Sequence, residues 1–81
     1  MEGFVIKTEL AGFVSWIDGF CSGGQPSRTC EILRALVFIN RDFAEKNLKE
    51  LRKKYPSRTF EIESAPENSR GAIAGENYWI V

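Results

Sequence analysis

The residues best suited to hold a ligand lie in one glycine-containing segment of the chain. Gly23 and Gly24 leave room for backbone N–H groups to approach an anion, and Arg28 adds a positive charge. The segment also carries three polar side chains, Gln25, Ser27 and Thr29. This pattern predicts a phosphate- or nucleotide-binding loop, although the lysine of the P-loop motif is missing. The alternative interpretation is a flexible connection between a hairpin and a helical turn.

Aromatic side chains form the second set of candidates, because their faces stack on bases and anchor protein interfaces. We assign Trp16 to the predicted ligand site. We assign Phe20, Tyr78 and Trp79 to a predicted interface between copies of the chain, so a homo-oligomer is expected. The apolar chain end that carries Tyr78 and Trp79 would be covered by a sheet or by a partner. Packing in the core is the competing explanation for these aromatic residues.

Few residues of the chain are suited to catalysis or metal binding. There is no histidine, so Cys21 and Cys30 lack the usual base that activates a thiol. Two cysteines without CxxC spacing cannot form an ordinary structural zinc site, and we expect both thiols to be free. The expectation is therefore no enzyme, no metal and no cofactor. A small enzyme that uses Asp18 or Glu76 is the third hypothesis.

Composition limits the classes of partner. The 81 residues form one domain, 1–81, with 11 basic and 11 acidic residues, so no general attraction to nucleic acid is expected. A basic cluster near residue 54 supports nucleic-acid binding as the less favoured alternative: Lys49, Arg52, Lys53, Lys54 and Arg58. No apolar run suits a membrane span and no signal peptide is evident, so we expect a cytoplasmic protein without a membrane partner.

Hydrophobic periodicity predicts the elements that position these residues. Residues 4–10 alternate, with Lys7 and Glu9 toward water, and residues 13–20 continue as a second strand after an Ala11-Gly12 turn. Residues 21–28 then read as a loop. Thr29 would cap a helical turn over residues 30–34, and a buried strand would cover residues 35–39.

The best-defined element is a helix over residues 41–54, capped by Asn40 and stopped before Pro56. Its predicted apolar stripe contains Phe43, Ala44, Leu48, Leu51 and Tyr55. A strand over residues 57–63 follows, with Glu61 and Glu63 toward water, then a loop or arm at 65–77 and a short strand at 78–81. The fold class is therefore α+β: a mostly antiparallel sheet with one main helix packed on a face, in the order β-β-short helix-β-α-β plus a C-terminal strand.

The core pattern from Phe4 to Ile62 resembles that of small uncharacterised proteins of bacteriophages and mobile elements. The segments that carry the resemblance are Val5-Ile6-Lys7-Thr8, Ala35-Leu36-Val37-Phe38, Arg41-Asp42-Phe43-Ala44, Leu48-Lys49-Glu50-Leu51 and Phe60-Glu61-Ile62. The resemblance implies a non-enzymatic binding protein. Such a protein would inhibit a bacterial defence component by binding a host protein or by sequestering a signalling nucleotide. No site residue is carried over from the resemblance.

Overall fold

β1 (Phe4–Leu10) is the central strand of the sheet. The structure, a computed structural model, describes residues 3–20 and 25–74. β1 pairs antiparallel with β2 (Phe13–Phe20) along one edge and with β5 (Thr59–Ser64) along the other, since Lys7 pairs with a residue of each strand. The first strand of the chain is therefore enclosed by strands on both sides.

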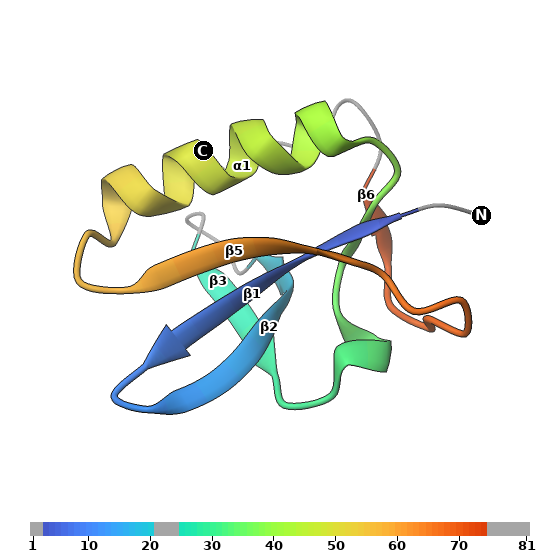
Figure 1. The fold of residues 1–81 in the computed structure, drawn as a ribbon, viewed down its shortest axis with the longest axis horizontal. Helices are drawn as coiled ribbons and strands as arrows, with labels where there is room; N and C mark the ends of the chain where they lie inside the picture. Colours follow the sequence, from blue (N-terminus) through green and yellow to red (C-terminus); the bar gives the residue numbers. More distant parts are fainter. Residues whose placement is uncertain (1–2, 21–24, 75–81) are drawn as a thin grey trace.

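The remaining strands extend the sheet on the β2 side of β1. β4 (Val37–Phe38) pairs antiparallel with the start of β1, next to the stretch that β2 occupies. β3 (Pro26–Thr29) pairs antiparallel with β2, and β6 (Ile73–Ala74) pairs parallel with β4. The result is a curled, mixed, six-stranded sheet (Figure 1). One parallel pair modifies the mostly antiparallel arrangement expected.

A two-residue turn joins β1 to β2. Its central residues both have positive φ, 52° at Ala11 and 85° at Gly12, as a type I′ hairpin turn requires. The predicted hairpin is confirmed. Glycine adopts this backbone conformation without a steric cost, whereas alanine does not.

Helix α1 (Arg41–Lys54) has the predicted bounds. The side chain of Asn40 caps it, because its Oδ1 accepts a 2.7 Å hydrogen bond from the backbone N–H of Asp42. The predicted stripe is also confirmed, as Ala44, Leu48 and Leu51 are buried. It lies on one face of the sheet, mainly over β5, β1 and β4 (Figure 1).

Two apolar clusters lie on opposite faces of the sheet. The main core joins the helix stripe to strand residues that include Ile6, Ile17, Phe38 and Phe60. The second cluster contains Val5, Ala35 and Val37, with Trp16, Ile32 and Ala65 packed against it. β1 is therefore buried on both faces near its start. The expectation that its second face points to water is wrong at Val5, because residues 32–37 cover that face.

The predicted loop between the second strand and the helical turn is shorter than expected. Pro26–Thr29 form strand β3 instead of loop, which adds a strand to the predicted order. The helical turn is a 3₁₀ helix, η1 (Ile32–Arg34), whose N-cap residue is Glu31, so the prediction that Thr29 caps it is wrong. The Thr29 hydroxyl instead accepts a hydrogen bond from Glu31 N. The strand predicted at 35–39 is reduced to the two residues of β4.

The segment predicted as a loop at 65–77 contains β6, whereas the short strand predicted at 78–81 lies outside the described residues. Backbone contacts hold the approach to β6 in place: Arg70 N donates to Leu33 O at 2.7 Å. At Gly71 an added Cβ atom would lie 2.0 Å from Ala35 O, so this close approach requires glycine. In the part of the chain that the structure describes, no helix is long and apolar enough to cross a membrane.

Candidate functional site

A groove of about 500 Å³ lies between β3 and the first residues of β2, which extend beyond the end of β3. We call it the β3 groove, and its described lining residues are Phe13, Val14, Ser15, Pro26, Ser27, Arg28, Thr29 and Cys30. It combines three residues of β2 with the whole of β3. Since α1 packs mainly over β5, β1 and β4, this end of the sheet is not under the helix.

The strand register creates the groove. β2 and β3 pair from Trp16 opposite Thr29 onward, so the chain leaves β2 at Cys30 and the start of β2 loses its neighbour on that edge. The register then shifts at Asp18, which is the extra residue of a β-bulge. β3 is therefore a short strand that covers only part of β2.

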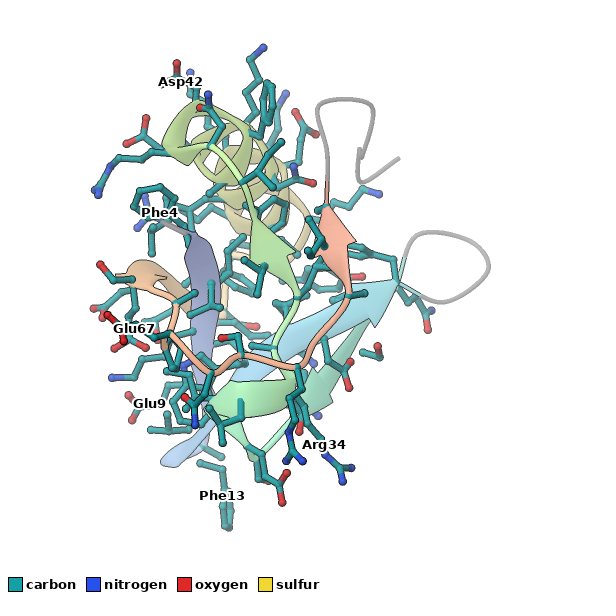
Figure 2. All side chains as sticks on the ribbon, turned by 90° about the vertical axis from the view of Figure 1, so that its right-hand side faces the viewer. Phe4, Glu9, Phe13, Arg34, Asp42 and Glu67 are labelled. Carbon is teal, nitrogen blue, oxygen red and sulfur yellow. The ribbon has the colours of Figure 1, made fainter. Side chains whose placement is uncertain are left out.

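Exposed apolar side chains stand at the mouth of the β3 groove. Phe13 is 78 % exposed and Val14 is 40 % exposed, although both belong to a strand of the core sheet. Figure 2 shows Phe13 projecting away from the sheet at the end of the hairpin. Single exposed apolar residues are common, but here two consecutive ones line the same groove, one on each face of β2, and offer apolar surface to a partner.

A hydroxyl pair lies below this mouth. Ser15 lines the groove and is nearly buried, and Thr8 of β1 lies opposite it in the strand register. Paired residues of antiparallel strands carry their side chains on the same face, so the two side chains are neighbours. Thr8 is 1 % exposed, and its Oγ1 has no hydrogen-bond partner among residues 3–20 and 25–74.

The β3 groove carries one charge among its described lining residues, that of Arg28. Arg28 is exposed, and its guanidinium makes no ion pair or hydrogen bond with the rest of the described chain. It lies opposite Ile17, whose side chain shares a face with Ser15 and Phe13 because strand residues alternate. The groove therefore combines an apolar mouth with hydroxyl side chains and, among its described lining residues, a single positive charge.

The predicted phosphate-binding residues are only partly brought together. Ser27, Arg28 and Thr29 line the β3 groove, Gln25 is exposed beside it, and Gly23 and Gly24 lie outside the described residues. The Ser27 hydroxyl donates to Asp18 Oδ1 at 2.5 Å, so a carboxylate occupies the position where a phosphate was expected. The Ser27 hydroxyl is therefore already engaged and is not free to donate to a phosphate.

Trp16 is not among the residues that line the groove. Its Nε1 donates a 2.8 Å hydrogen bond to Glu63 Oε1, on the face of the second apolar cluster. Glu63 is therefore half-buried and bonded, which corrects the expectation that it simply faces water. Phe20, predicted at an interface, packs against the main core, while Tyr78 and Trp79 lie outside the described residues.

The basic end of α1 takes part in the fold itself. Arg52 donates a 2.8 Å hydrogen bond to Phe60 O, and the Arg58 guanidinium lies 5.2 Å from the centre of the Tyr55 ring. Lys54 also has a partner. These contacts give the cluster a structural explanation in addition to the helix dipole.

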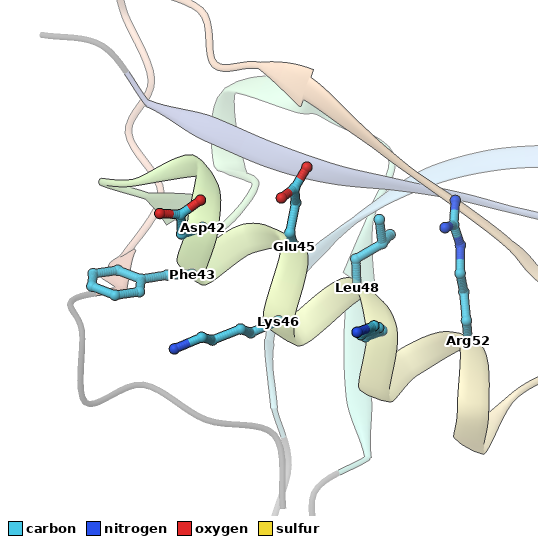
Figure 3. A pocket seen from close by; sticks show the side chains of 7 residues that line it. Asp42, Phe43, Glu45, Lys46, Leu48 and Arg52 are labelled. Carbon is cyan, nitrogen blue, oxygen red and sulfur yellow. The ribbon is translucent and has the colours of Figure 1, made fainter.

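A second hollow, of about 520 Å³, lies along α1 (Figure 3). Its described lining comes from one helix and carries charges of both signs: Asp42, Phe43, Glu45, Lys46, Leu48, Lys49 and Arg52. Glu45 pairs with Arg41, and the Arg52 side chain extends toward β5, where it meets Phe60 O (Figure 3). Charged groups engaged in the fold make this hollow a weaker candidate than the β3 groove.

Among residues 3–20 and 25–74, no three His, Cys, Asp or Glu side chains gather as a metal ion would require. Cys30 is a free, exposed thiol at the edge of the β3 groove, and Cys21 is outside the described residues. Comparison of the sequence with protein-family models gave no match, and comparisons with curated proteins and with solved structures gave no significant match either.

Sequence reasoning missed five groove residues: Phe13, Val14, Ser15, Pro26 and Cys30. The available signal was two apolar residues directly after the Ala11-Gly12 turn. Residues at the tip of a hairpin extend beyond the elements that bury the rest of the strands. Their type indicated a strand, whereas their position next to the turn indicated exposure.

Proposed function

We propose that this chain is a non-enzymatic binding protein whose site is the β3 groove and whose partner is another protein. The observation that carries the proposal is the exposure of Phe13 and Val14 in a groove beside Arg28, which forms no ion pair within the described part of the chain. Burying a phenylalanine side chain that water now surrounds contributes about 2 kcal/mol to association. Aromatic and arginine side chains also supply much of the binding energy of protein interfaces.

A protein partner agrees better with the groove than a nucleotide does. A nucleotide needs several donors for its phosphates, and one of the candidate donors, the Ser27 hydroxyl, already donates to Asp18. The apolar mouth instead suits a side chain of a protein segment. The resemblance to bacteriophage and mobile-element proteins favours a host protein as that partner. Nucleic-acid binding has less support, because Arg52 and Arg58 are engaged within the fold.

Selection from a random displayed-peptide library tests the proposal. The full chain is the bait, and Phe13→Ser is the matched counter-bait, with circular dichroism showing that both are folded. We expect peptides that bind the original chain at least tenfold more tightly than Phe13→Ser in calorimetry.

The control variant is Ile73→Ser, which removes another exposed apolar side chain, 59 % exposed, from β6 at the other end of the sheet path. It should bind the selected peptides as the original chain does. The proposed site would be refuted if no selected peptide bound the original chain more tightly than Phe13→Ser. It would also be refuted if Phe13→Ser and Ile73→Ser lost binding equally.

A further inference from the structure

β3 leaves one of its edges without a strand neighbour in the described part of the chain. The sheet path begins at β3, which pairs only with β2. Successive residues of an antiparallel strand direct their N–H and C=O groups to alternate edges, so some of these groups in β3 point away from β2. An open edge of this kind accepts a further strand through main-chain hydrogen bonds.

The open edge is short. Pro26 is the first residue of β3 and has no N–H to donate, so only Ser27, Arg28 and Thr29 offer complete backbone groups. A short edge that starts with proline resists extended edge-to-edge aggregation. It therefore favours a brief extended segment that gains further binding energy from side chains.

The charge of the lining determines the chemistry of that segment. Arg28 is the one charged group that the described residues place in the β3 groove, and it has no carboxylate partner there. The complementary group is a carboxylate, which an arginine side chain binds through two parallel hydrogen bonds. An apolar side chain of the same segment would cover Phe13.

The register also predicts the spacing between these two groups. Arg28 lies opposite Ile17, and Phe13 is four residues from Ile17 on the same face of β2. Four residues of a strand span about 13 Å, and an extended segment has the same rise and the same alternation. A carboxylate and a large apolar side chain four positions apart would therefore match the separation of Arg28 and Phe13 along the strands. Because the width of β3 separates the added segment from β2, the apolar side chain must be long enough to extend past the end of β3 to Phe13.

From these relationships we infer that the β3 groove binds an extended protein segment that adds as a strand to β3, places a carboxylate on Arg28 and places an apolar side chain four residues away on Phe13. This inference rests on the proposed function, because it specifies the ligand of the same groove. A second copy of the chain in the groove is the competing occupant and an outcome of the test.

The experiment uses peptides that require Phe13, selected as above, and full-length variants at Arg28. Most of these peptides should carry Asp or Glu four residues from a large apolar residue. Arg28→Ala should weaken their binding about fivefold to tenfold in calorimetry, with Arg28→Lys between the two, since a partly exposed ion pair contributes modestly. Two peptide series should be compared, one N-methylated at the odd-numbered amides and one at the even-numbered amides. Only the series whose methylated amides face β3 should lose binding, because strand addition uses the N–H groups of alternate residues.

Separate outcomes overturn the inference and the proposed function. Phe13-dependent peptides that lack the acidic residue, or that bind Arg28→Ala as tightly as the original chain, would refute the predicted carboxylate. They would still support the β3 groove as the binding site. Tolerance of N-methylation in both series would refute strand addition. Absence of Phe13-dependent peptides would refute the site itself. Sedimentation that shows a dimer dissociating in Phe13→Ser would assign the groove to a second copy of the chain.

Discussion

The indole Nε1 of Trp16 donates a 2.8 Å hydrogen bond to Glu63 Oε1. The two residues belong to β2 and β5, and β1 lies between these strands. The bond therefore connects the two neighbours of β1 across the face that carries Val5. It also holds the Trp16 ring against the second apolar cluster, which explains why this aromatic side chain is not part of the groove.

Replacing the acceptor of this bond should destabilise the fold. Glu63→Ala leaves the half-buried indole N–H without a partner, and the free energy of unfolding should fall by about 1 kcal/mol. Urea unfolding followed by circular dichroism measures the change. Glu61→Ala is the control, since Glu61 is exposed on the same strand and should change stability by less than about 0.5 kcal/mol. Equal effects of the two variants would show that the bond contributes nothing.

The hairpin turn offers two substitutions with opposite expected effects. Ala11→Asn should raise the free energy of unfolding by about 0.5–1 kcal/mol, because asparagine tolerates the positive φ of a type I′ turn better than alanine. Gly12→Ala should lower the free energy of unfolding by about 1 kcal/mol, because alanine is strained at the positive φ of Gly12. The strain arises in the backbone, since no atom lies within 4 Å of the added Cβ. Thermal melts of both variants test the turn, and a stabilising Gly12→Ala would contradict this geometry.

The unpartnered hydroxyl of Thr8 predicts a stabilising substitution. Thr8→Val keeps the shape of the side chain and removes a buried polar group that has no hydrogen bond, so the free energy of unfolding should rise by about 1 kcal/mol. Thr59→Val is the control, because Thr59 is an exposed residue of β5 and its substitution should change stability little. A marked loss of stability in Thr8→Val would mean that the hydroxyl has a partner in solution.

Gly71 should be one of the least tolerant positions of the chain. An added Cβ would lie 2.0 Å from Ala35 O and 2.7 Å from Arg34 O, and these backbone atoms cannot rotate away. Gly71→Ala should therefore lower the free energy of unfolding by about 3 kcal/mol. At Gly19, by comparison, an added Cβ would meet Ser27 Oγ at an ordinary 3.5 Å, so Gly19→Ala should cost less than about 1 kcal/mol. Denaturant titrations that rank the two variants in the reverse order would refute the close approach.

Local sequence signals predicted the elements that local interactions determine. The helix at Arg41–Lys54 follows from a side-chain cap and a 3.6-residue apolar period, and the hairpin follows from a turn between two alternating segments. Both signals depend on residues that are close in sequence. The α+β class with one helix followed from these elements.

The strands that sequence reasoning missed depend on distant partners. Pro26–Thr29 contains few residues with strand propensity and forms β3 because β2 presents an open edge to it. Ile73–Ala74 forms β6 because Gly71 lets the chain approach Ala35 closely enough to pair with β4. The groove was missed for the same reason: its two sides are separated along the chain and their register decides which residues line it.

The position of β1 has a consequence for how the chain acquires its structure during synthesis. β1 leaves the ribosome well before Thr59–Ser64, the strand that pairs with one of its edges. That edge of β1 stays without its partner strand until Thr59–Ser64 has been synthesised. Such long-range pairing slows folding and leaves an unfinished chain open to aggregation or to chaperones until β5 emerges.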